Sequence, residues 1–342
     1  MTIQTVLGEI NPDDLGVTLM HEHLCQRSSD NPGLSYKISE TWLRRLKNAG
    51  CRTLCEVTPI SPYGEVKMPM DPNPLSIEDQ LKAYQELSKE SRINVLVSTG
   101  YYTPDKAPIE NVDAKFIASR IVKVIKEGIG DTGIRPAIIK VGSHKVPLSQ
   151  MERKVFAAAG MAQAETGLPI CTHACTGSRD QLEILLENGA DPNHCYFSHV
   201  EAEFGLEGRS LKEEIAYLTN IAKKGGTLLF NNFGFEHDTP WEDLVAILRS
   251  LVEAGYENKI HICMDANFHI DREGSVRLEA DAKNPECRRR DYSYIFKYSL
   301  PLLRQEGFTE ENFKMFFVDV PKMVLTPFQP KKKRTAGRAR KA

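Results

Sequence analysis

The stretch VTLMHEHL (residues 17–24) decides the fold class of this chain. It joins a short β-branched and apolar run to the polar triplet His21-Glu22-His23. In a doubly wound dinucleotide-binding sheet, the first strand is normally followed by a glycine-rich turn of the form G-x-G-x-x-G. The triplet contains no glycine. It carries instead the kinds of side chain that a (β/α)8 barrel places after its strands, where its catalytic groups lie. The stretch therefore favours a barrel over an open sheet.

The rest of the chain repeats one pattern, in which a short apolar run is followed by a polar turn and then by a longer amphipathic segment. The composition of the runs suits strands that are buried on both faces. We expect eight strands, at residues 17–20, 53–57, 93–97, 137–141, 168–172, 195–198, 227–230 and 260–264. Helical spacing of apolar residues predicts helices that include 77–87 (with Ser76 as N-cap), 151–165, 211–223 and 241–254 (after Thr239-Pro240). The alternation predicts an α/β protein with a (β/α)8 TIM barrel.

The charge distribution indicates how the chain is divided. The chain has 342 residues and a formal net charge of −2. Residues 329–342 carry seven basic side chains with no acidic or large apolar ones, so we expect a basic, disordered tail. Removing these seven charges leaves −9 on residues 1–328, which we expect to form a single domain. A basic run can attract nucleic acid, but the acidic body gives that interpretation no support, and a solvated appendage is favoured.

The composition excludes several classes of protein. With 41% hydrophobic and 26% charged residues, the chain is neither collagen-like nor wholly disordered. No apolar run approaches the roughly 18 residues that a membrane helix needs, and the N-terminus lacks the basic and apolar regions of a secretory signal. The eight cysteines are scattered, as is typical of reduced thiols. We therefore expect a cytoplasmic protein without membrane association.

Six side chains that bind metals or can be modified to do so follow or end the predicted strands. In a barrel these positions meet at one mouth. The six are His21 and His23 after the first strand, Lys140 near the end of the fourth, His173 after the fifth, His199 after the sixth and Asp265 after the eighth. His21 and His23 are two residues apart, which puts both imidazoles on one face of an extended backbone. Imidazole and carboxylate ligands suit Zn²⁺ and neighbouring divalent metals rather than Ca²⁺.

Lys140 needs a separate explanation. A lysine at a strand end is usually paired with a carboxylate. Here the neighbours Ile139 and Val141 predict a buried backbone, and an ammonium group beside divalent cations would be strongly disfavoured. An amine that reacts with CO₂ forms a carbamate, which has one negative charge and two ligand oxygens. Carboxylated Lys140 (N6-carboxylysine) is therefore the form that fits a metal site.

Several segments resemble the phosphotriesterase family of the amidohydrolase superfamily, over residues 3–327. They are residues 6–10, 19–24, 98–102, 138–142, 166–173, 197–199 and 264–265. The resemblance implies a binuclear metal centre in which His21, His23 and Asp265 hold the more buried metal and His173 and His199 the more exposed one. Carboxylated Lys140 and a hydroxide would bridge two divalent ions, with zinc the best match and manganese or cobalt as alternatives. The hydroxide would attack an ester, and Asp265 would act as the catalytic group that accepts its proton.

The predicted substrate-binding residues lie in the loops after the third and eighth strands. Arg288-Arg289-Arg290 ends a long loop, and arginine forks match phosphate or carboxylate geometry; a solvated helix start is an equally good interpretation. Arg289 with Tyr292 resembles the phosphate-holding pair of the family's sugar-lactone-phosphate lactonases. Tyr101 and Tyr102 would face the same mouth, where they would bind a sugar ring or simply pack at the barrel rim.

These features lead to three hypotheses about function. The first is a metal-dependent lactonase that opens a sugar lactone, with or without a phosphate; the second is a phosphotriesterase or other ester hydrolase. The third is an inactive barrel that acts as a binding protein. The first two need a small-molecule substrate as partner, and the resemblance allows a homodimer. His144, His237 and His269 follow strands and could contact substrate, whereas His194 and His261 should lie at the opposite, stability end.

Overall fold

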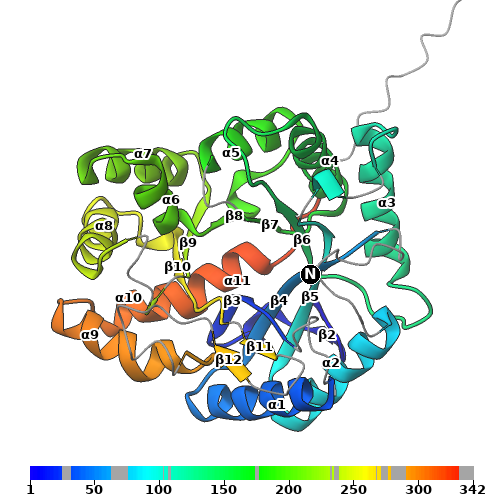
Figure 1. Cartoon of the computed structure of the whole chain (residues 1–342), viewed down its shortest axis with the longest axis horizontal. Helices are drawn as coiled ribbons and strands as arrows, with labels where there is room; N and C mark the ends of the chain where they lie inside the picture. Colours follow the sequence, from blue (N-terminus) through cyan, green and yellow to red (C-terminus); the bar gives the residue numbers. More distant parts are fainter. Residues whose placement is uncertain are drawn as a thin grey trace, which may run out of the picture.

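Eight parallel strands form the centre of the computed structural model (Figure 1). Each pairs with its neighbour in chain order, from β3 to β10. The structure describes residues 1–24, 32–62, 76–102, 104–106, 109–173, 177–231, 233–234, 239–266, 268–270, 276–278 and 290–330. The strands are β3 (Thr18–Glu22), β4 (Thr53–Ile60), β5 (Asn94–Tyr101), β6 (Ile138–Gly142), β7 (Ile170–His173), β8 (Cys195–Ser198), β9 (Thr227–Phe230) and β10 (Ile260–Ile262). All eight predicted strands are confirmed.

Helices surround the strands and bury their apolar faces against them (Figure 1). They are α1 (Pro32–Asn48), α2 (Ile77–Ser91), α3 (Ala114–Glu127), α4 (Gln150–Thr166), α5 (Ser178–Glu187), α6 (Val200–Glu207), α7 (Leu211–Lys223) and α8 (Trp241–Glu253). The four predicted helices correspond to α2, α4, α7 and α8. The hydroxyl of Ser76 accepts from the backbone N–H of Asp79, as an N-cap should. The (β/α)8 barrel predicted from the sequence is thus confirmed.

Three smaller features complete the described fold. β1 (Ile3–Thr5) and β2 (Gly8–Ile10) form an antiparallel hairpin, as do β11 (Phe268–Ile270) and β12 (Val276–Leu278). The chain then passes through α9 (Leu300–Gln305), α10 (Glu310–Lys314) and α11 (Val320–Leu325). The backbone carbonyl of Val324 in α11 accepts from His194, which immediately precedes β8. α11 therefore covers the end of the barrel at which the strands begin.

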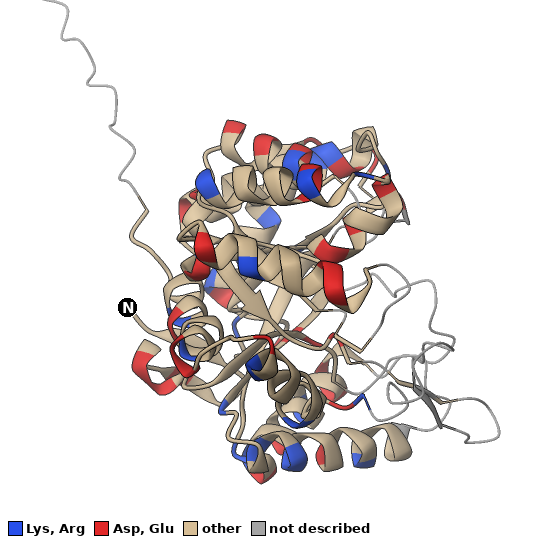
Figure 2. Cartoon of the chain, turned by 90° about the vertical axis from the view of Figure 1, so that its left-hand side faces the viewer, with Lys and Arg blue, Asp and Glu red and all other residues tan. Residues whose placement is uncertain are grey.

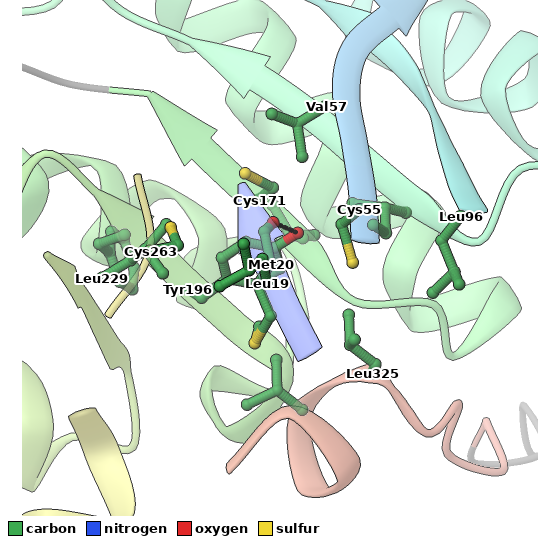
Figure 3. Packing of buried hydrophobic residues seen from close by; sticks show 14 of the residues in the cluster. Leu19, Met20, Cys55, Val57, Leu96, Cys171, Tyr196, Leu229, Cys263 and Leu325 are labelled. Carbon is green, nitrogen blue, oxygen red and sulfur yellow. Dashed lines mark hydrogen bonds between the residues drawn. The ribbon is translucent and has the colours of Figure 1, made fainter. Parts of the chain in front are cut away.

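The barrel interior is filled with apolar side chains and sulfur atoms (Figure 3). Leu19, Cys55, Cys171, Tyr196 and Leu229 project inward from five different strands and are fully buried. Leu325 of α11 lies below them and closes the base. Because the interior is filled, the mouth, where the strands end, is the part of the barrel at which we expect a ligand site.

The predicted division of the chain is only partly described. Residues 331–342, most of the predicted basic tail, lie outside the described residues, and a single domain ending at residue 328 remains a prediction. On the face shown in Figure 2, acidic and basic residues are interspersed along the helices. None of the helices in the described part of the chain has the length and apolar composition of a bilayer-spanning segment. In the part of the chain that the structure describes, five cysteines are buried free thiols: Cys51, Cys55, Cys171, Cys195 and Cys263.

Candidate metal centre

Three of the predicted ligands lie together at the barrel mouth. His21 lies in β3 near its end, His23 follows that strand, and Asp265 follows β10. Each offers a ligand atom within 4.8 Å of the others. Asp265 Oδ1 lies 3.1 Å from His23 Nε2 and 3.6 Å from His21 Nε2. Two imidazoles and a carboxylate at this separation form a donor set that suits a zinc-like ion.

His199 and His173 extend this group toward the neighbouring strands. The ring of His199 lies 5.2 Å from that of His21 and 4.5 Å from that of His173, between centroids. Asp265 Oδ2 lies 3.6 Å from His199 Nε2. The four predicted histidine ligands thus form a continuous row around the mouth, and Asp265 contacts three of them.

Lys140 lies beneath this row, in the middle of β6. Its side chain is 1% exposed, and its Nζ donates to Cys171 Sγ at 3.2 Å and to the carbonyl oxygen of Thr172 at 3.2 Å. Neither partner is a carboxylate, so the usual pairing of a strand-end lysine is not found here. Gly100 of β5 is paired with Lys140 of β6, and the two backbones are very close there. A Cβ on Gly100 would lie 2.0 Å from the Lys140 carbonyl oxygen, so no larger residue fits at this position. Gly100 therefore lets β5 approach β6 closely.

Besides burial, Lys140 lowers the pKa of a histidine in each half of the row, His21 and His173. Burial lowers the pKa of His21 well below its usual range, and the charge of Lys140 lowers it further. Burial, then His199 and then Lys140 lower the pKa of His173 in the same way. Both imidazoles are therefore neutral, which is the form that binds a metal ion. Lys140 is placed to act on either side of the centre.

Asp265 and His23 form an ion pair. Burial raises the pKa of Asp265, but electrostatic interactions with His21 and His23 outweigh burial and hold this pKa well below its usual range. Burial lowers the pKa of His23, but the nearby carboxylates of Asp265 and Glu56 outweigh burial and raise this pKa to about 10. A metal ion that binds His23 must displace this proton, so binding releases a proton to solvent.

Hydroxyl groups fix the orientation of two of the imidazoles. The Nδ1 of His21 lies 2.8 Å from Ser198 Oγ, and the Nδ1 of His23 lies 2.6 Å from Thr58 Oγ1. In both rings Nε2 is thereby directed toward Asp265. Partners of this kind set the tautomer of a metal-binding histidine.

Two of the ligand-bearing residues have a strained backbone. His199 has φ +62° and Asp265 has φ +46°, in the left-handed region that non-glycine residues rarely adopt. The backbone N–H of His199 donates to Asn231 Oδ1 at 2.9 Å, which stabilises this conformation. Strain of this kind persists only where surrounding contacts enforce it, and it is concentrated at functional sites.

The two tyrosines predicted to bind substrate lie in different environments. Tyr101 is 4% exposed and belongs to the core. Tyr102 is half-buried at the mouth; its hydroxyl lies 3.3 Å from His173 Nε2, and its ring packs edge-on against His144 at 5.0 Å. The carbonyl of Tyr102 accepts from His144 Nε2 at 3.0 Å. Tyr102 and His144 thus flank the exposed side of the row.

The predicted phosphate-holding residues are described only in part. Arg289 lies outside the described residues, as does Arg288. Arg290 is buried and donates to the carbonyl oxygens of Phe233 and Met264, so it holds two loops together. Tyr292 is fully buried, and its hydroxyl donates to the carbonyl oxygen of His23 at 2.5 Å. Tyr292 therefore supports the His23 backbone, and its role in substrate binding remains a prediction.

Sequence reasoning missed two buried carboxylates beside the ligands. Glu22 accepts from the backbone N–H groups of Met264 and Ala266. Glu56 accepts from the backbone N–H groups of Leu24 and Thr58. A signal was present, because both glutamates interrupt apolar strands, and a buried acid must find hydrogen-bond donors.

Comparisons with known proteins identify the family. The Phosphotriesterase family matches residues 1–325. A phosphotriesterase homology protein of Mycobacterium tuberculosis is 26% identical, over 94% of this chain and 97% of its own. An aryldialkylphosphatase of Saccharolobus solfataricus is 27% identical, over 92% and 96%. The crystal structure of a lactonase from Listeria monocytogenes superimposes with a TM-score of 0.74 at 21% identity, over 96% and 100%. The barrel, the donor set and the match over nearly the whole chain show that this protein is a metal-dependent hydrolase of the phosphotriesterase family.

Proposed function

We propose that the protein opens a lactone, a cyclic ester, and that its substrate is a sugar lactone. The observation that carries the proposal is the convergence of His21, His23 and Asp265 at the mouth, with His199 and His173 alongside. Two divalent metal ions, most suitably zinc, would be held by these five side chains and by carboxylated Lys140. When bound, such a pair supplies Lewis acidity and a nucleophile at neutral pH.

The environment of Lys140 supports a bridging carbamate. Its amine is buried against a thiol and a carbonyl, with no negative charge in contact in the described residues. An ammonium group is costly there, whereas a carbamate between two cations would be neutralised. Lys140 contributes to the lowered pKa of both His21 and His173, so it lies near both halves of the row.

Asp265 is the residue best placed to accept a proton during ester cleavage. Its carboxylate contacts three imidazoles, and its two oxygens face different members of the row. The strained backbone fixes the carboxylate in this position, so no reorganisation is needed when the proton arrives. We therefore assign Asp265 as the catalytic proton acceptor.

The exposed side of the row favours a hydroxylated substrate. A molecule bound beside His173 would meet the phenol of Tyr102 and the imidazole of His144, both of which form hydrogen bonds. A metal ion on His173 Nε2 would release the Tyr102 hydroxyl toward the substrate. The hydroxyl groups of a sugar lactone would gain binding free energy from hydrogen bonds to these two side chains, whereas the alkyl groups of a neutral triester cannot form them.

The test is a substrate panel on the full chain loaded with Zn²⁺, Mn²⁺ or Co²⁺. We expect kcat/KM to be highest for a sugar lactone, and comparison of a phosphorylated with an unphosphorylated lactone shows whether a phosphate is recognised. Asp265→Asn serves as the inactive control. A preference for a neutral aryl dialkyl phosphotriester would overturn the proposal in favour of the second candidate, phosphotriester hydrolysis. That alternative is supported by the 27% identity to an aryldialkylphosphatase.

A further inference from the structure

The strands at the two ends of the sheet order, β3 and β10, are joined by side chains. Backbone ladders connect each pair of neighbours from β10 round to β3, and within the described residues none connects β3 directly to β10. At the base of this seam, His261 Nε2 accepts from the backbone N–H of Met20 at 3.1 Å. At the mouth, the carboxylate of Glu22 bridges the same two segments. One seam is therefore closed by two side chains, one at each end.

The Glu22 carboxylate holds the backbone on both sides of Asp265. Its Oε1 accepts from Met264 N at 2.9 Å and its Oε2 accepts from Ala266 N at 2.8 Å. Glu22 is completely buried. Between the two bonded N–H groups, Asp265 adopts φ +46°. The two hydrogen bonds hold the backbone on either side of this left-handed residue, so they fix the turn that carries the Asp265 carboxylate.

We infer that Glu22 is a positioning residue for the metal centre: its carboxylate sets the Met264–Asp265–Ala266 turn and thereby places Asp265 Oδ1 between His21 and His23. The inference rests on the proposed metal centre and not on the identity of the substrate. Glu22 separates the two histidine ligands in the sequence, and it thus orients the third member of their donor set, Asp265, which is distant in the sequence.

The geometry requires a carboxylate at this position. Each oxygen of Glu22 accepts one N–H, and a glutamine of the same shape would turn an NH₂ group toward one of these donors. One of the two N–H groups would then lose its acceptor inside a buried site, and the turn would no longer be fixed on both sides.

The neighbouring strand uses the same device independently. Glu56 of β4 accepts from Thr58 N at 2.7 Å and from Leu24 N, and Thr58 in turn orients His23. Each of the two glutamates thus fixes backbone N–H groups next to a ligand. Buried carboxylates are therefore a recurring way in which this mouth is ordered.

The experiment compares Glu22→Gln with His261→Leu, which breaks the same seam at the opposite end. Both full-length variants are prepared metal-free and titrated with Co²⁺, and the visible absorption spectrum and the affinity against a competing chelator are recorded. We expect Glu22→Gln to weaken Co²⁺ binding by at least about 10-fold and to change the spectrum, because outer partners of metal ligands have effects of this size. His261→Leu should lower the temperature of thermal unfolding yet keep the wild-type affinity and spectrum.

Two results would overturn the inference, and they differ from each other. If Glu22→Gln binds Co²⁺ with the wild-type affinity and spectrum, Glu22 only stabilises the fold and the proposed centre survives. If the wild-type protein binds no Co²⁺ at all, the centre and the inference fail together. Should Glu22→Gln not fold, Glu22→Asp, whose shorter carboxylate cannot reach both N–H groups, replaces it with the same expected outcome.

Discussion

The two ends of β10 (Ile260–Ile262) differ in what their side chains do. At the start of the strand, His261 donates to the carbonyl oxygen of Phe316 at 2.7 Å and accepts from Met20 N, so both ring nitrogens have backbone partners. Just past its end, Asp265 has a strained backbone and is surrounded by imidazoles. A satisfied polar group stabilises the fold, whereas an aspartate held under strain among three histidines is prepared for a ligand. The base of the barrel is built for stability and the mouth for binding.

The largest effect is expected from a substitution that disrupts the metal centre at the mouth and leaves the base of the barrel unchanged. Lys140→Ala should lose at least one metal ion and reduce kcat/KM by at least about 1,000-fold, because a ligand must matter more than its outer partners, which are worth 10–100-fold. Short carboxylic acids should partly restore activity by occupying the place of the carbamate. Elemental analysis and kinetics with and without propionate measure both effects. Unchanged metal content in the variant would contradict the bridging role.

A second prediction concerns the base. Burial lowers the pKa of His261 to about 4. Between the unfolded value near 6.5 and this value, the unfolded chain binds a proton that the folded chain does not, so folding stability falls as the pH decreases through this window. The loss amounts to about 3 kcal/mol. His261→Gln keeps a donor and an acceptor but cannot titrate, so the difference in stability between wild type and variant should shrink by this amount from pH 7 to pH 4.

Denaturant unfolding of the metal-free proteins at several pH values measures this difference. Working without metal keeps the ligands of the mouth in the same state in both proteins, so that their titration cancels in the comparison. Stability curves that run parallel from pH 7 to pH 4 would show that His261 does not titrate as a buried group.

Removing the metal should have a somewhat smaller effect on stability. An ion that binds only the folded state at 100 times its dissociation constant contributes about 2.7 kcal/mol. Treatment with a chelator should therefore lower the thermal unfolding temperature by several degrees, and zinc should restore it. If neither the chelator nor zinc changes the thermal unfolding temperature, the prediction that a metal ion binds at the mouth is contradicted.

The smallest effect is expected from removing the hydroxyl group that orients one candidate metal ligand, His21. Ser198→Ala removes the hydroxyl that orients His21 at 2.8 Å and should weaken metal affinity by about 10-fold. Ser88→Ala is the matched control, because its hydroxyl is also buried and donates to the carbonyl oxygen of Ile93 at 2.7 Å, far along the chain from any ligand. Equal metal affinity in the two variants would show that Ser198 does not set the orientation of His21.

The sequence was most informative about the strands. All eight were predicted, because β-branched and apolar runs repeat along the chain. The candidate metal ligands were predicted from residue type, from their positions after the strands and from the resemblance to the phosphotriesterase family. Helices α1, α3 and α5 were not predicted, although all three pack against the core. α6 was harder to anticipate, because it begins directly after His199, whose left-handed backbone replaces a loop.

Side-chain direction explains what the sequence could not provide. Tyr101 and Tyr102 are adjacent, yet one belongs to the core and the other to the mouth, since successive residues of an extended backbone point to opposite faces. Arg290 is bonded to loop carbonyls, a pairing that depends on two loops distant in sequence. Glu22 also depends on a distant partner, because its acceptors meet Met264 and Ala266 only when the barrel closes.

Anomalous X-ray diffraction at the zinc absorption edge, from crystals of the zinc-loaded protein, tests the central claim most directly. The account predicts two peaks at the mouth, one among His21, His23 and Asp265 and the other beside His173 and His199, with additional density on the Lys140 amine between them. A mouth without anomalous signal, or an unmodified Lys140 that still donates to Cys171 and Thr172 in the loaded crystal, would contradict it.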